Sequence, residues 1–194
     1  MNARASSLIR RITELEEDLE LELAKTRAEL HFTIEEKKMK FEQAIIEKHK
    51  KLKTNVAMYV MRAHPLNVLT APVIYGLLPP LLVLDMAVSF YQAVCFPAYG
   101  IIKVERKNYL VYDRALLPYL NSLEKLNCLY CSYANGLLAY WREIAARTEQ
   151  YWCPIKHARN IIAAHARYHD FIDFGDQEAY DRDLEGLRDK LKTP

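Results

Sequence analysis

Apolar and charged positions alternate with helical spacing through the first part of the chain. Between Leu8 and Val56 there is no glycine or proline, and Glu, Lys, Leu, Ala and Arg dominate, which favours helix. Apolar pairs recur every 11 residues, at Leu8/Ile12, Leu19/Leu23, Leu30/Ile34, Phe41/Ile45 and Leu52/Val56. Such a repeat corresponds to about 3.67 residues per turn, so it predicts a nearly straight helical stalk over residues 1–62 that self-associates.

The same helix has an alternative position, flat on a membrane with its apolar stripe among the headgroups. Acidic residues crowd its first half, at Glu14, Glu16, Glu17, Asp18, Glu20 and Glu22, where anionic lipid would repel them. This charge distribution favours association of the stalk into a homo-oligomer. The second half turns basic at Lys48, Lys50, Lys51 and Lys53, which suits a phosphate-rich surface.

A continuous apolar window follows over residues 63–102. Its only formally charged residue is Asp85. The window is too long for one membrane span of roughly 20 residues and barely long enough for two. Because Pro79 and Pro80 are adjacent, we expect a bend near residues 79–85, with Asp85 close to its tip. The pattern predicts a membrane hairpin, either re-entrant in one leaflet or of two short spans. A buried hairpin of a soluble protein is the alternative.

Basic residues flank this window on both sides. Lys48 to Arg62 precede it, and Lys103, Arg106 and Lys107 follow it. The tendency of positive flanks to stay inside predicts a protein of the bacterial inner membrane, with both soluble arms on the cytoplasmic side. The lipid bilayer is therefore an expected partner.

Residues 103–194 have the composition of a small cytoplasmic helical domain. The segment 101–113 predicts a short β-hairpin around a polar turn at Arg106 to Asn108. We expect a helix from Asp113 or Leu117-Pro118 to Ala134, a stop at Asn135-Gly136, and a second helix from Leu137 to Gln150. A third helix is expected from Cys153-Pro154, and a last one over residues 177–192. The predicted fold class is mainly α.

Three of the four cysteines lie in this domain at helical spacing. Cys128 and Cys131 are three residues apart, and Cys153 precedes His157 by four, so each pair shares one face of its expected helix. If the chain folds back at Asn135-Gly136, the two pairs can form a tetrahedral Cys3His site for structural zinc. Cys153 is expected at a helix N-terminus, a position that favours the thiolate form that a metal needs.

Other interpretations of these residues stay open. An iron–sulfur cluster is an alternative cofactor. The cysteines can also be ordinary core residues, or a redox-active thiol pair, and Cys95 is expected to be a packing residue. A face with His157, His165 and His169 suggests haem or a second metal, although a solvated helix face is the simpler interpretation.

Enzymatic function has little support in the sequence. Glu143 and Arg147, four residues apart, are expected to form a semi-buried ion pair, with a catalytic acid as the alternative. The chain has no glycine-rich phosphate loop and no nucleophile elbow. The net charge of +2 and the lack of a basic patch interleaved with aromatics argue against nucleic acid as a partner.

Two motifs carry a resemblance to a known family. NCLYCSYANG at residues 127–136 and EQYWCPIKHA at 149–158 resemble the signature of a family of uncharacterised bacterial membrane-associated proteins. The resemblance covers about residues 72–175 and implies that they form one module. It transfers no activity and no functional residue.

These patterns together predict a membrane-anchored structural or scaffolding protein. Its N-terminal helix would assemble copies, and its hairpin would shape the membrane or recruit a partner from a membrane complex. The alternative is a metal-binding or redox accessory protein that uses Cys128, Cys131 and Cys153. An enzyme acting on lipid would need a polar, water-accessible pocket near Asp85 or Glu143.

Overall fold

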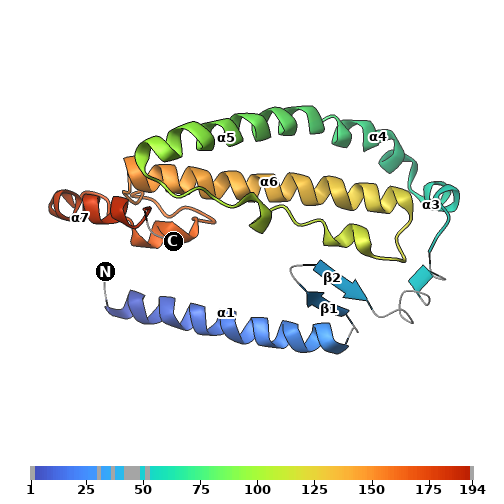
Figure 1. Cartoon of the computed structure of the whole chain (residues 1–194), viewed down its shortest axis with the longest axis horizontal. Coiled ribbons are helices and arrows are strands. Elements are labelled where there is room, and N and C mark those ends of the chain that lie inside the picture. The colour runs from blue at the N-terminus through green and yellow to red at the C-terminus, as the bar shows by residue number, and fades with distance from the viewer. Residues whose placement is uncertain (1–2, 30–31, 36–37, 42–48, 51–52, 193–194) are drawn as a thin grey trace. The chain divides into compact units, whose positions relative to one another are not determined.

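The protein is mainly helical, as predicted. The computed structural model describes residues 3–29, 32–35, 38–41, 49–50 and 53–192 (Figure 1). The described residues divide into two compact units. Unit 1 comprises residues 1–61 and 113–125, and unit 2 comprises residues 62–112 and 126–194.

Unit 1 begins with helix α1, Ala3–Glu29, and continues into a short hairpin of β1, Phe32–Glu35, and β2, Lys38–Phe41. The strands are antiparallel and pair Phe32 with Phe41. The prediction of one helix from Leu8 to Val56 is therefore wrong at residues 32–35 and 38–41, which form strands. Phe32, Thr33 and Ile34 are aromatic or β-branched, and residues of this kind fit a pleated strand better than a helix.

The 11-residue repeat survives only in part. The pairs Leu8/Ile12 and Leu19/Leu23 lie on α1, whereas Ile34 and Phe41 lie in the strands. Leu30, Ile45 and Leu52 fall outside the described residues. Val56 begins a short helix, α3, Val56–Arg62.

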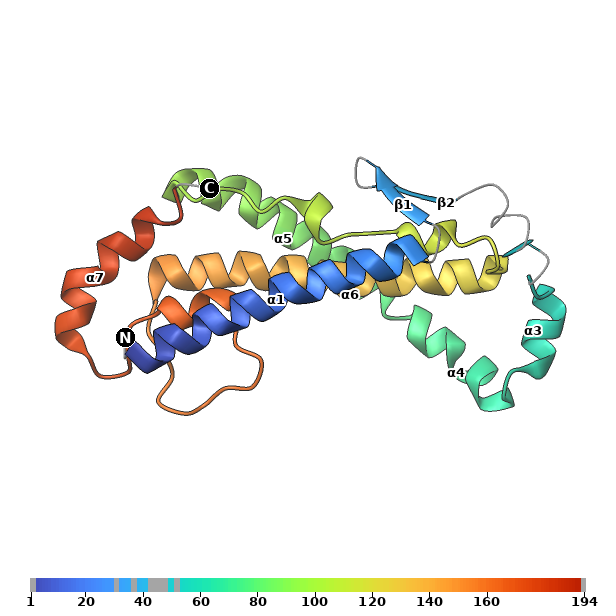
Figure 2. The same ribbon diagram turned by 90° about the horizontal axis from the view of Figure 1, so that it is seen from below.

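Unit 2 contains the apolar window as helices α4, Pro65–Tyr75, and α5, Leu78–Tyr99. The predicted bend near residues 79–85 is not present, because α5 runs without interruption through Asp85. The break lies earlier, at Gly76 and Leu77. Pro79 and Pro80 lack the N–H groups that would bond the carbonyls of Tyr75 and Gly76, so the helix restarts there with the prolines in its first turn. Figure 2 shows α4 and α5 continuing in one general direction without reversing.

Helix α6, Ser122–Trp152, lies beside α5 and runs parallel to it (Figure 1). Contacts keep the same order along both helices: Asp85 meets Tyr133, Gln92 meets Tyr140, and Tyr99 stacks on Tyr151. Between the two helices the chain travels back along α6. We call residues 100–112 the return segment; it contains a single 3₁₀ turn, η1, Arg106–Asn108. Two parallel neighbouring helices require such a return.

Two predictions for this region are wrong. Residues 101–113, all of which the structure describes, form no strand pair, since η1 occupies the polar turn and extended chain flanks it. Asn135-Gly136 does not end a helix, because α6 passes straight through it. Gly136 has another role: a Cβ there would lie 2.6 Å from the carbonyl oxygen of Tyr109. The glycine therefore allows the return segment to approach α6 closely.

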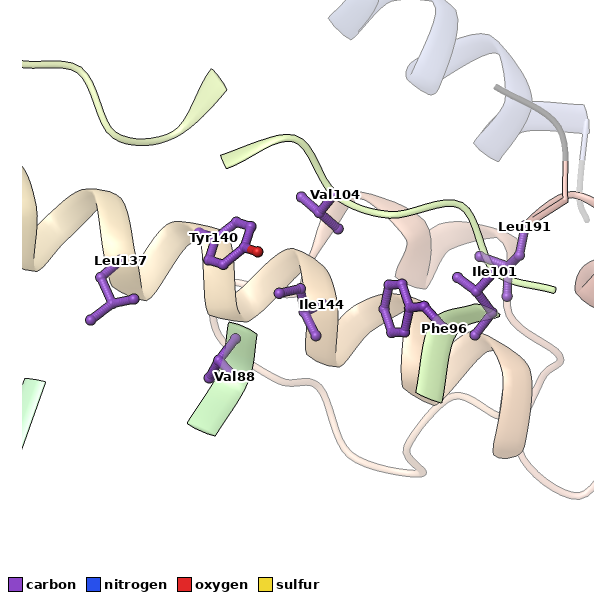
Figure 3. Packing of buried hydrophobic residues seen from close by; sticks show 8 residues of the cluster. All are labelled: Val88, Phe96, Ile101, Val104, Leu137, Tyr140, Ile144 and Leu191. Carbon is purple, nitrogen blue, oxygen red and sulfur yellow. The ribbon is translucent and has the colours of Figure 1, made fainter. Parts of the chain in front are cut away.

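The core of unit 2 forms where α5, the return segment, α6 and the C-terminal end meet. Figure 3 shows its buried residues, which are Val88, Phe96, Ile101, Val104, Leu137, Tyr140, Ile144 and Leu191. After α6 come the 3₁₀ helix η3, Ala166–Asp170, and helix α7, Gln177–Asp189. The predicted last helix is confirmed at its start, where the Asp176 side chain accepts a hydrogen bond from the backbone N–H of Ala179.

Candidate functional site

The outer face of α4 and α5 is apolar and exposed. On α5, Val83, Met86, Phe90 and Val94 recur at helical spacing, with 61%, 65%, 71% and 53% of their surface exposed. On α4, Leu69 and Val73 are exposed in the same way. We call these six residues the apolar stripe. Such patches on soluble proteins mark surfaces that contact a partner or a membrane.

The helical segment Pro65–Tyr99 is long and apolar enough to cross a membrane. Only 11% of its most apolar window is buried inside the protein. A core helix of a soluble protein is instead covered on most of its surface, so the alternative of a buried hairpin has little support.

The inner face of α5 carries two buried polar side chains, Asp85 and Gln92, beside its core residues Val88 and Phe96. The carboxylate of Asp85 accepts hydrogen bonds from the guanidinium of Arg106, from Tyr133 at 2.9 Å and from Ser89 at 3.3 Å. Asp85 is 9% exposed, so the one charged residue of the window faces the protein and not the apolar stripe. Burial and the hydrogen bond to Asp85 raise the pKa of Tyr133 to about 12, and its hydroxyl stays protonated as a donor.

Gln92, about two turns further along α5 than Asp85, joins three elements. Its side-chain oxygen accepts a hydrogen bond from the backbone N–H of Val104 at 2.7 Å, and its Nε2 donates to the hydroxyl of Tyr140 at 2.7 Å. Both ends of the buried amide are satisfied, which burial of a polar group requires. These contacts fix α5 against the return segment and α6.

Helix α6 limits how α5 can meet a bilayer. It accompanies the end of α4 and all of α5, from the contact of Tyr130 with Ile74 to the contact of Tyr151 with Tyr99. Along this length α6 carries Arg142, Glu143, Arg147 and Glu149. Charged residues at the bilayer centre cost roughly 2.5–3.5 kcal/mol each. With α6 packed as observed, a span of α5 across the bilayer would carry these charged residues into hydrocarbon.

The predicted metal ligands do not come together. Cys128 and Cys131 lie on α6, and Cys153 follows the end of the same helix. Cys153 is about 22 residues after Cys131, or roughly 33 Å at 1.5 Å per residue. The predicted Cys3His site depended on a turn at Asn135-Gly136. The structure has no turn there, because α6 continues through both residues. Among the residues that the structure describes, no group of three or more His, Cys, Asp and Glu could hold a metal ion. Binding of zinc or an iron–sulfur cluster stays a prediction.

The segment after Cys153 is not the expected helix. Pro154 and Lys156 bond to Ile172 through their backbones, which draws Ile155 into a bridge with Ile172. His157 lies in this extended segment, with its backbone N–H donating to the hydroxyl of Tyr168 at 2.6 Å. His165 pairs with Glu149 at 2.9 Å. The expected face with His157, His165 and His169 is therefore not formed on a helix.

The predicted ion pair of Glu143 and Arg147 is confirmed. Arg147 Nε donates to Glu143 Oε1 at 2.8 Å, and both side chains are 18% exposed. The sequence did not indicate the third member, Arg167 of η3, whose guanidinium donates to the same oxygen at 2.8 and 3.0 Å. Burial raises the pKa of Glu143, but the hydrogen bonds from the two arginines outweigh it, and the pKa lies below its usual value.

Comparisons of this chain with protein-family models, with curated proteins and with solved structures gave no match.

Proposed function

We propose that this protein is a membrane-bound scaffold that lies along one leaflet through the apolar stripe of α4 and α5. The observation that carries the proposal is the exposed, uncharged outer face of Pro65–Tyr99. Burial of apolar surface contributes about 25 cal/mol per Å², so exposed Met, Phe and Val side chains favour transfer into lipid. The expected location is the cytoplasmic side of a bacterial inner membrane, in accord with the basic flanks of the window.

The inner contacts of α5 support the flat position. Asp85 and Gln92 bond to the return segment and to α6, so that only the outer face is available to lipid. Insertion across the bilayer would either break these contacts or bring the charged residues of α6 into hydrocarbon. A shallow insertion requires neither.

Self-association through α1 is the second part of the proposal. Leu8, Ile12, Leu19 and Leu23 of α1 are exposed at helical spacing. The acidic residues of α1 disfavour an anionic lipid surface, and the partner we propose is the α1 of a second copy. Several copies joined in this way would bring several apolar stripes to one membrane, and the assembly would bind the membrane with greater avidity than a single copy.

Vesicle flotation tests the membrane surface. We expect the full chain to float with phosphatidylcholine vesicles and Phe90→Asp to lose most of this binding, because a charge would enter the lipid-facing stripe. Phe174→Asp is a matched control, because Phe174 is also a phenylalanine and is 68% exposed, but lies outside the stripe. Equal binding of both variants, or no binding of the wild-type chain, would contradict the proposal.

Light scattering tests self-association. Leu19→Gln is expected to lower the molar mass of the assembly, because Leu19 lies on the exposed stripe of α1. Leu21→Gln is the control, since Leu21 is 64% exposed but lies off the stripe. A wild-type chain that is monomeric at all concentrations would exclude this part of the proposal and leave membrane binding untouched.

A further inference from the structure

A cavity of about 310 Å³ opens beside the start of the return segment. Its basic lining residues come from four parts of unit 2: Lys103 from the return segment, Arg147 from α6, Arg167 from η3, and Lys190 from the end of α7. Ligand cavities commonly have volumes of roughly 300–1,000 Å³, so this one is large enough for a small anion with part of its attached group.

The positive charges at this cavity exceed the negative ones. Arg147 and Arg167 share a single carboxylate, that of Glu143. Lys190 pairs with Asp170 at 3.3 Å, where both side chains are more than half exposed and the attraction is weak. Lys103 makes no ion pair with any residue that the structure describes. An anion would balance this excess.

The two arginines have hydrogen-bond donors to spare. A guanidinium carries five N–H groups in a planar fork. Arg147 directs one to Glu143 and one to the backbone oxygen of Ile102. Arg167 uses three, for Glu143 and for Gln150 Oε1. These bonds hold both side chains in place at the cavity wall, which reduces the entropy that ligand binding would otherwise cost.

The remaining lining residues suit a ligand with a polar head and an apolar neighbour. Asn108 and Tyr109 bring polar side chains, and Ile102, Val104 and Leu191 form an apolar wall. Glu105 also lines the cavity, but its carboxylate pairs with Lys107 at 3.1 Å, so the cations still outnumber the carboxylates there. Val104 and Leu191 also belong to the core in Figure 3, so this wall is fixed by packing. Burial raises the pKa of Tyr109, which leaves its hydroxyl protonated at neutral pH.

We propose that this cavity binds the phosphate group of an anionic ligand, with Arg147 and Arg167 as fixed donors and Lys103 and Lys190 as exposed cations beside them. Arginine forks match phosphate oxygens in geometry, and lysine adds charge. The phosphate can belong to a lipid headgroup or to a soluble molecule. The site needs no membrane, so it stands independently of the membrane-bound role proposed above.

Calorimetric titration of the full chain with inorganic phosphate tests the site itself. We expect saturable binding that Lys103→Glu weakens by about tenfold or more, because a charge contact is replaced by repulsion. Lys103 is exposed and without an ion pair in the described structure, so the fold should survive the change, and a circular dichroism spectrum checks this. Lys53→Glu changes the net charge equally but does not line the cavity, and we expect it to bind as the wild type does.

Two further arms identify the source of the phosphate. Short-chain phosphatidic acid and glycerol phosphate are titrated separately, and phosphatidylcholine vesicles are compared with and without phosphatidic acid. Stronger binding of the lipid forms, lost in Lys103→Glu, assigns a headgroup; equal binding of glycerol phosphate assigns a soluble ligand. No saturable binding of any probe, or the same loss in Lys53→Glu, overturns the proposal. Failure of Phe90→Asp to alter flotation would bear only on the membrane-bound role.

Discussion

Arg106 Nη2 lies 2.6 Å from Asp85 Oδ2, and this contact ties the only charged residue of α5 to the return segment. The hydrogen bond that Arg106 donates to Asp85 raises the pKa of Arg106 further above its usual value. We expect Asp85→Asn to lower the free energy of unfolding by about 1–2 kcal/mol, the value of a charged hydrogen bond reduced by solvent around the half-exposed arginine. Urea denaturation measures it. Asp113→Asn, at an exposed carboxylate, should change stability by much less.

Gly136 allows the return segment to approach α6. We expect Gly136→Ala to destabilise unit 2 by about 1–3 kcal/mol, because the added methyl group would overlap the Tyr109 carbonyl and backbone has little freedom to move. Gly186→Ala in α7 provides the opposite control: its Cβ would meet nothing within 4 Å, and alanine should stabilise the helix by up to about 1 kcal/mol. Thermal unfolding distinguishes the two. A neutral Gly136→Ala would argue against this packing.

Glu143 should make stability depend on acid pH. Its pKa is lowered in the folded state, so its ionic contacts contribute fully above the ordinary value of 4.5 and are lost as pH falls through the lowered value. We expect Glu143→Gln to cost about 2–3 kcal/mol at neutral pH, because two arginines lose their common partner. The variant should also flatten the fall of stability between neutral and acidic pH.

The control for this pH profile is Glu178→Gln. Glu178 is exposed and makes no ion pair within the described residues, so its removal should leave the acid dependence unchanged. Urea denaturation of the wild type, Glu143→Gln and Glu178→Gln from neutral to acidic pH measures the free energy of unfolding of each protein. If the free energy of unfolding falls equally with decreasing pH in Glu143→Gln and in the wild type, the ion pairs of Glu143 do not contribute to the acid dependence.

The continuity of α6 can be measured directly between two exposed cysteines. Cys95 and Cys128 are replaced by serine, and spin labels are attached to Cys131 and Cys153. Double electron–electron resonance should then give a separation of roughly 33 Å, as expected from the rise of a continuous helix. A much shorter distance would require a break in α6 at Asn135-Gly136.

If α4 and α5 lie along one leaflet, the residues just before and just after these helices face the same side of the membrane. In a cysteine-free background, Arg62→Cys and Lys107→Cys lie before and after the apolar helices. If these helices lie along one leaflet, a membrane-impermeant maleimide should label both from the same side of sealed vesicles. Labelling from opposite sides would show that Pro65–Tyr99 crosses the bilayer and that α6 separates from α5.

Local patterns gave the helical class, the apolar window and the start of α7, because each depends on neighbours within a few turns. They failed where a distant contact decides the outcome. Asn135-Gly136 resembles a helix stop locally, yet its glycine serves a contact with Tyr109. Cys153-Pro154 resembles a helix start, yet the backbone there pairs with Ile172. The Cys3His prediction depended on both local interpretations.

One signal was present in the sequence and was missed. Asn121 and Glu124 form a reciprocal cap, in which the Asn121 side chain accepts from the N–H groups of Leu123 and Glu124 while Glu124 accepts from the N–H of Asn121. The spacing of a capping box marks Ser122 as the helix start. Asp113 and Leu117-Pro118 were the wrong candidates. Arg167 gave no such signal, since it reaches Glu143 only through the fold.

The parallel order of α5 and α6 has a consequence for synthesis. Asp85 and Gln92 each bond to a residue 48 positions later in the chain. At about 5–20 residues per second, the ribosome needs roughly 2–10 seconds to supply these partners. Until α6 emerges, Asp85 lacks Tyr133 and Gln92 lacks Tyr140, and polar side chains without these partners oppose deep entry of the nascent α5 into a bilayer. In the membrane-bound role proposed above, this delay would keep the helix at the surface until α6 emerges to cover Asp85 and Gln92.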